Sequence, residues 1–157
     1  MTVDRTTARA VADVPGALAL ATVELPVPPA RVFEALTSPQ IVEWWVRPGV
    51  FDTRDWSGEV RVGGSWRASG VGGGRPYVLE GEFVEVDRPR RLVHTWRLVG
   101  VPGATSTATY LLDEVEGGTR ITFRQSGFGS ADTCIATAIG WETSFARLRQ
   151  LLSDQKE

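Results

Sequence analysis

The chain has 157 residues, a length that suits one domain with a substantial core rather than two. Its formal net charge of −2 gives no electrostatic footprint for nucleic acid or for an anionic membrane, so we expect neither as a partner. One cysteine and one histidine exclude an internal disulfide, a cysteine-rich metal site and a multi-histidine metal site, and we expect no metal and no cofactor.

The N-terminal residues predict neither a secretory signal nor a membrane anchor. Asp4 and Asp13 interrupt the first sixteen residues, which lack a continuous hydrophobic stretch. No run of about 18 apolar residues occurs elsewhere in the chain. We therefore expect a cytoplasmic protein with a flexible N-terminal extension over residues 1–16 and a single domain over residues 17–157.

The domain begins with a predicted strand at residues 18–25, followed by two short helices. Pro28 suits the first turn of the first helix, because an amide N–H at that position has no partner. Ser38 is a capping residue for the second helix. The apolar residues of this second helix are Ile41, Trp44 and Trp45.

From Phe51 onward the apolar residues recur with a period of two, which is typical of half-buried strands. Glycine and proline separate these segments, so successive strands are joined by short connections and pair antiparallel. No alternation of strands and helices occurs here, which excludes a parallel dinucleotide-binding sheet. The predicted strands cover residues 59–62, 65–70, 77–86, 91–98, 105–112 and 119–126.

The last segment, residues 131–153, predicts one long amphipathic helix. Alternating steps of four and three residues place its apolar side chains on one face. A helix with such a wide apolar stripe must pack against another surface, and the sheet before it is the candidate. We therefore expect a curved sheet that grips this helix, with Trp141 largely buried between them. The stripe consists of Cys134, Ala138, Trp141, Phe145, Leu148 and Leu152.

The element order and several motifs resemble a known superfamily. The motifs follow the family's order from about residue 18 to residue 153, and include Val62-Gly63-Gly64-Ser65-Trp66, Gly81-Glu82-Phe83, Pro89-Arg90-Arg91-Leu92-Val93 and Gly140-Trp141. The chain is similar to the START-like (SRPBCC) superfamily and, within it, to the family of the activator of the heat-shock protein 90 ATPase (AHSA-like). The resemblance implies an α+β helix-grip fold, in which a curved antiparallel sheet of about six to seven strands wraps around a long C-terminal helix, with two short helices after the first strand.

The resemblance leaves three kinds of function open. The first, which we favour, is a small-molecule binding domain that holds a hydrophobic or aromatic ligand in a cavity between the sheet and the last helix. The second is an enzyme of the cyclase or dehydratase type found in the same superfamily. The third is a chaperone-interacting module with a role in the stress response. A sixteen-residue extension leaves no room for the co-chaperone's separate N-terminal domain, so we expect no chaperone partner. We expect the protein to be a monomer or a homodimer.

His94 is the candidate for chemistry. It alternates with Leu92 and Trp96 along its predicted strand, which places it on the apolar face. There it either contacts a ligand and moves a proton, or is a core histidine satisfied by one neighbour, and we favour the second interpretation.

Aromatic side chains make up most of the predicted cavity wall, and Tyr77 and Tyr110 supply polar tips. Whether these side chains enclose a void or fill it depends on packing that the sequence does not determine. The predicted ligand-cavity residues are Trp45, Trp66, Tyr77, Phe83, His94, Trp96, Tyr110, Phe123, Trp141 and Phe145.

Overall fold

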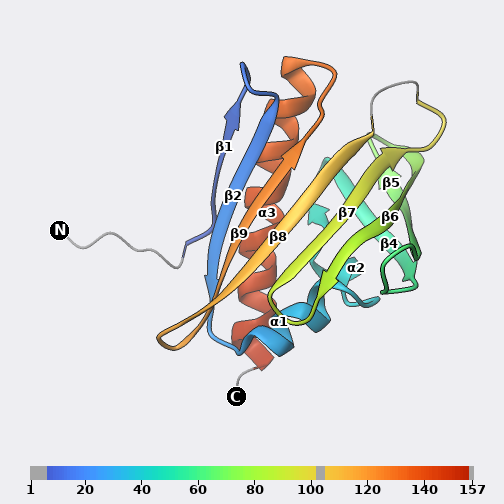
Figure 1. Ribbon diagram of the computed structural model, residues 1–157. Helices are drawn as coiled ribbons and strands as arrows, with labels where there is room; N and C mark the ends of the chain where they lie inside the picture. Colours follow the sequence, from blue (N-terminus) through green and yellow to red (C-terminus); the bar gives the residue numbers. More distant parts are fainter. Residues whose placement is uncertain (1–6, 102–104, 156–157) are drawn as a thin grey trace.

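The computed structural model describes residues 7–101 and 105–155. Within these ranges nine strands form one antiparallel sheet in the order β1-β2-β9-β8-β7-β6-β5-β4-β3 (Figure 1). The strands are β1 (Arg9–Asp13), β2 (Leu18–Leu25), β3 (Val46–Arg47), β4 (Phe51–Gly58), β5 (Ser65–Gly72), β6 (Arg75–Asp87), β7 (Arg91–Leu98), β8 (Ser106–Val115) and β9 (Gly118–Ser126). The helices are α1 (Pro29–Leu36), α2 (Ile41–Trp44) and α3 (Ala131–Gln155). This is the predicted helix-grip fold.

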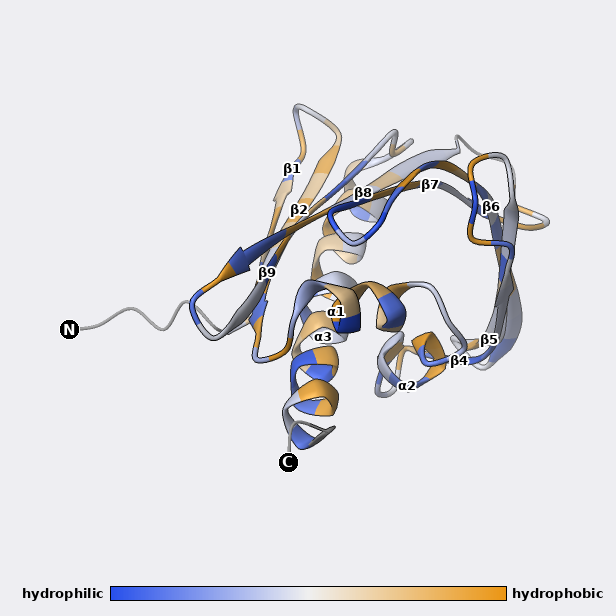
Figure 2. Cartoon of the chain, turned by 60° about the horizontal axis from the view of Figure 1, so that its bottom comes forward, coloured by the Kyte–Doolittle hydropathy of each residue, from blue (hydrophilic) through white to orange (hydrophobic). Residues whose placement is uncertain are grey.

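The sheet curls into a half-barrel around α3 (Figures 1 and 2). At one end of the sheet β1 and β2 pack directly on α3, while α1 and α2 lie beneath the arch that the other strands form in Figure 2. Two glycines allow neighbouring strands to approach closely. A Cβ atom at Gly70 would overlap the carbonyl oxygen of Asp52, and one at Gly81 would overlap that of Thr95. Only a residue without a side chain fits at these positions.

The predicted apolar stripe of α3 is confirmed, since each of its six side chains is at most 5% exposed. The helix begins after Ser130, whose hydroxyl oxygen accepts a hydrogen bond from the Thr133 amide at 3.1 Å and so caps the first turn. No helix in the described ranges is long and apolar enough to cross a membrane.

The predicted N-terminal extension is partly a strand. Residues Arg9–Asp13 pair with β2 as β1, and the Ala10 amide donates a hydrogen bond to the Glu142 carboxylate of α3 at 2.9 Å. Small residues face the core from this segment: Ala8 is buried in the core, and Ala10 packs against the core. A strand without large inward side chains gives little periodic signal in a sequence. The predicted flexibility of residues 1–6 lies outside the described residues.

The strand predicted at residues 59–62 is wrong. The strand in this part of the chain is β4, which ends at Gly58, and residues 59–64 connect it to β5. A bulge between Thr53 and Asp55 places Thr53 and Trp56 on the buried face, three residues apart, and so breaks the period of two. Together with β1 and the two-residue β3, this brings the sheet to nine strands rather than the predicted six to seven.

Candidate functional site

Ring side chains from distant parts of the chain meet between the sheet and α3. All predicted cavity residues except Tyr77 belong to one network, in which ring centroids in contact lie 4.2–6.3 Å apart. Such distances are typical of directly packed rings. The rings therefore occupy the space in which the sequence predicted a cavity. The members of this network are Trp44, Trp45, Trp66, Phe83, His94, Trp96, Tyr110, Phe123, Trp141 and Phe145.

Five of these side chains form a closed loop of contacts, which we call the aromatic circuit. Between ring centroids, Trp45 lies 5.7 Å from Trp66, and Trp66 lies 5.1 Å from His94. His94 lies 5.6 Å from Tyr110, and Tyr110 lies 5.9 Å from Trp141. Trp141 closes the circuit at 6.0 Å from Trp45. Each member is at most 5% exposed, so the circuit is a buried structure.

Trp96 packs against four of the five circuit members. Its ring centroid lies 5.0 Å from that of Trp45 and 5.4 Å from that of Trp66. It lies 5.8 Å from Trp141 and stacks on His94 at 6.2 Å. Unlike the circuit members, Trp96 is only partly buried. It is thus the ring that joins the buried circuit to the surface.

His94 is neutral in this environment. Complete burial lowers the pKa of its imidazole to about 4, a shift that the nearby Thr95 carbonyl opposes only in part. The ring nitrogen Nδ1 lies 3.0 Å from that carbonyl oxygen, so Nδ1 carries the proton and donates it. Nε2 is then the unprotonated nitrogen of a neutral ring, with capacity to accept a hydrogen bond.

The two tyrosines do not form an acid–base pair with His94. The hydroxyl groups of Tyr77 and Thr53 share a hydrogen bond at 2.5 Å. The Tyr110 ring contacts His94, but its hydroxyl has no hydrogen-bond partner among the described residues, and burial raises its pKa well above the usual value. Among the described residues, His94 therefore has no hydrogen bond to either tyrosine, the pairing on which a cyclase-type reaction by these residues would rest.

Trp45 carries an unpartnered polar atom. Its indole Nε1 is buried without a hydrogen bond, although buried N–H groups are normally paired. Other indoles of the network follow that rule. Trp44 donates to the Ala35 carbonyl at 3.1 Å, and Trp66 donates to the Thr95 carbonyl at 3.1 Å. The Trp45 indole is thus a hydrogen-bond donor of the circuit that has no acceptor within the part of the chain that the structure describes.

The sequence analysis missed a buried polar chain that connects α3 to the sheet. Trp141 Nε1 donates to Gln125 Oε1 at 2.8 Å, and Gln125 Nε2 donates to the Ser106 hydroxyl at 2.7 Å. Ser106 in turn donates to the Trp96 carbonyl at 3.3 Å. Gln125 follows Ile121 and Phe123 at the inward phase of its strand, so strand periodicity could have identified it.

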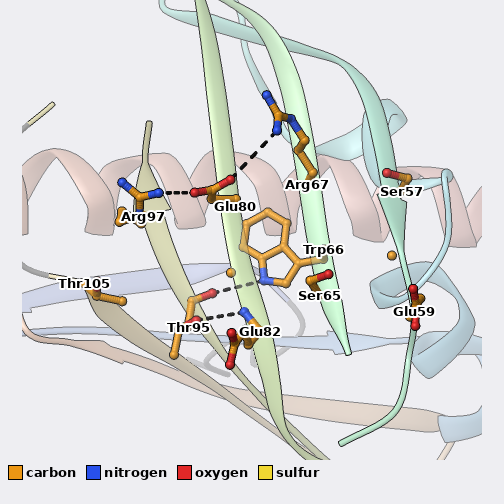
Figure 3. Close-up of a pocket in the computed structure, with 12 residues that line it drawn as sticks. Ser57, Glu59, Ser65, Trp66, Arg67, Glu80, Glu82, Thr95, Arg97 and Thr105 are labelled. Atoms are coloured by element: carbon orange, nitrogen blue, oxygen red, sulfur yellow. Dashed lines mark hydrogen bonds and ion pairs between the residues drawn. The ribbon is translucent and has the colours of Figure 1, made fainter. Parts of the chain in front are cut away.

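A second, polar site lies on the face of the sheet that points away from α3 (Figure 3). This pocket has a volume of about 740 Å³, and Trp66 is the predicted cavity residue in its lining. Glu80 lies between Arg67 and Arg97 and forms ion pairs with both. Because these charges satisfy one another, the pocket matches an apolar ligand less well than the aromatic circuit does.

The interior around the circuit is uncharged. Within the described ranges no Asp, Glu, Lys or Arg is buried, and the buried polar residues are Thr53, His94, Ser106, Thr119, Gln125 and Ser144. An ionised ligand would lose its hydration there without gaining a countercharge.

Comparisons with known proteins agree with this fold. Ms6760 from Mycobacterium smegmatis has 21% sequence identity and a TM-score of 0.78, and the match covers 91% of this chain and 94% of that one. MLL2253 from Mesorhizobium loti has 25% identity and a TM-score of 0.73, over 89% and 98% of the two chains. A Rhodobacter sphaeroides protein has 21% identity and a TM-score of 0.78, over 94% and 99%.

The domain is thus a helix-grip domain of the START-like type. The family model for activator of Hsp90 ATPase homolog 1-like proteins matches residues 26–153, and the chain belongs to that family. A comparison with curated proteins gave no match.

Proposed function

We propose that this protein is a small-molecule binding domain whose hydrophobic or aromatic ligand lies between the sheet and α3. The observation that carries the proposal is the aromatic circuit. It gathers ring faces from the end of α2, from three strands and from α3 around an uncharged interior. Walls of this kind, mostly aromatic with a few polar atoms, are typical of sites for small organic molecules.

A polar atom of the circuit supports the same function. A core built for packing alone normally pairs its buried polar groups. Here Trp45 Nε1 is buried without a partner. A ligand that offers one polar atom on an apolar frame would satisfy this group, which gives the site a means of selecting its ligand.

Binding requires a movement of side chains. The rings of the network touch one another, so a ligand is accommodated only when at least one ring leaves its place. Backbone changes are not needed for this, since ring side chains rotate between discrete rotamers.

A ligand screen tests the proposal. Neutral flat compounds should raise the melting temperature of the protein, because they bind the folded state alone, and native mass spectrometry should show the complexes. Carboxylate analogues of the same shape should do neither.

Two substitutions on α3 give a test variant and its control. Trp141→Phe, inside the circuit, should weaken binding, whereas Ile139→Ser, at a position that is 44% exposed, should leave it unchanged. If the folded protein binds no neutral compound in such a screen, the proposal is wrong.

A further inference from the structure

We propose that the indole of Trp96 occupies the ligand's position in this structure, and that the ligand is a neutral molecule about two fused rings in size with an oxygen that accepts a hydrogen bond from Trp45. This inference rests on the proposed function and specifies its ligand. It is carried by the contacts of Trp96, by its partial exposure and by the unpartnered indole of Trp45.

The contacts of Trp96 are those expected of a molecule held by the aromatic circuit. Its ring packs on four circuit members, with the shortest centroid distance, 5.0 Å, to Trp45. It stacks on His94 with an interplanar angle of 21°, while it meets Trp66 and Trp141 at steeper angles. A flat ligand in this place would meet one nearly parallel ring and three inclined rings.

Trp96 is also the least buried member of this group. The five circuit side chains are buried, whereas Trp96 is partly exposed and is followed by the exposed Arg97 and Leu98. Rotation of its side chain toward the surface would vacate an indole-sized space without uncovering the rest of the core.

The strand pairing around Trp96 is open on one side. Between β6 and β7, Glu80 pairs with Arg97 and Phe83 pairs with His94, and between these pairs the ladder is replaced by a hydrogen bond from the Glu82 amide to the Thr95 hydroxyl at 2.8 Å. The Trp66 indole binds the Thr95 carbonyl in this gap. On the other side Trp96 pairs with Ser106 of β8. Regular ladder pairing thus holds the Trp96 backbone on the β8 side alone.

The chemistry of the wall defines the ligand. No buried charge faces it, and His94 is neutral, so an ionised ligand would be disfavoured. Trp45 Nε1 is a buried donor without a partner and lies on the ring that packs closest to Trp96. A carbonyl or ether oxygen of a ligand in the place of Trp96 would pair this donor.

Removal of the Trp96 indole tests the inference. Trp96→Gly should bind 1-indanone and indane, two neutral bicyclic probes of nearly the same shape, at least about tenfold more tightly than the wild-type protein, because no indole competes for the space. The measurement is isothermal titration calorimetry. Trp56→Gly is the control: Trp56 is a tryptophan of the same core, 5% exposed, that is not a member of the ring network. It should show no such gain.

A second substitution tests the hydrogen bond. In the Trp96→Gly background, Trp45→Phe should weaken the binding of 1-indanone, which carries a carbonyl oxygen, about five- to tenfold. The affinity for indane should change by less than about twofold. Equal weakening of both probes would overturn the acceptor assignment. If Trp96→Gly does not fold, Trp96→Val keeps a strand-favouring residue and still removes most of the indole.

The outcomes separate this inference from the proposed function. Ligand binding by the wild-type protein, without a gain in folded Trp96→Gly or Trp96→Val, would overturn the placement of Trp96 alone. Probe binding by the variants, with no neutral compound bound by the wild-type protein, would overturn the proposed function and with it the ligand assignment.

Discussion

At the scale of single residues, burial determines the protonation of His94. In the unfolded chain its pKa has the ordinary value of 6.5, whereas burial lowers the folded-state pKa to about 4. Between these two pH values the unfolded state takes up a proton that the folded state does not. The contribution of His94 to stability is therefore fully present above about pH 6.5 and is lost as the pH falls toward 4.

The variant His94→Gln should remove this dependence, since glutamine keeps hydrogen-bonding capacity but does not titrate. Between pH 7 and pH 4 the wild-type protein should lose about 2–4 kcal/mol more of its unfolding free energy than the variant does. Urea denaturation at a series of pH values measures both curves. Because His94 is the one histidine of the chain, no second imidazole complicates the comparison. Parallel curves would contradict a buried neutral His94.

Trp141 should contribute strongly to stability. It is 5% exposed, packs against six other rings and donates its Nε1 hydrogen to Gln125. Trp141→Ala should therefore cost about 3–5 kcal/mol of unfolding free energy. Trp141→Phe, which keeps a ring but leaves the Gln125 oxygen unpaired, should cost about 1–3 kcal/mol. Equilibrium denaturation measures both. A cost below about 1 kcal/mol for Trp141→Ala would be incompatible with this packing.

At the scale of elements, two glycines with different surroundings should respond in opposite ways to alanine. A Cβ at Gly140 of α3 would lie 3.6 Å from the nearest ring carbon of Phe51, an ordinary contact. Gly140→Ala should thus stabilise the helix by about 0.5–1 kcal/mol. Gly81→Ala would place its Cβ on the Thr95 carbonyl oxygen and should destabilise the protein by about 2–3 kcal/mol. Melting temperatures of the two variants check the signs, and a stabilised Gly81→Ala would refute the close strand approach.

The elements also show what the sequence could predict. The buried face of α3 was predictable because its periodicity is local and its side chains are large. The strand β1 was not, because alanines face the core there, and β4 was obscured by its bulge at Thr53. The ten predicted cavity residues followed from strand and helix phase. The contacts among them, and the missing partner of Trp45, depend on distances between segments far apart in the chain, which no periodicity encodes.

At the scale of the whole molecule, the curled sheet and α3 enclose rings rather than an open cavity. The polar chain from Trp141 through Gln125 and Ser106 connects the helix to β9, β8 and β7, so the frame around the rings is fixed while Trp96 stands at its partly exposed edge. In the proposed function, this frame would hold the walls of the binding site in place when Trp96 moves, so that little ordering entropy would be lost on binding.

The most direct test follows the indole N–H signals of the tryptophans by two-dimensional ¹H–¹⁵N spectroscopy while a neutral aromatic compound that raises the melting temperature is added. The wild-type chain has six such signals. Binding in the aromatic circuit predicts saturable shifts of the Trp45 and Trp96 signals, with the Trp56 signal unchanged. Unchanged Trp45 and Trp96 signals, with shifts confined to backbone amides around Arg67, Glu80 and Arg97, would place the ligand on the outer face of the sheet and contradict a site between the sheet and α3.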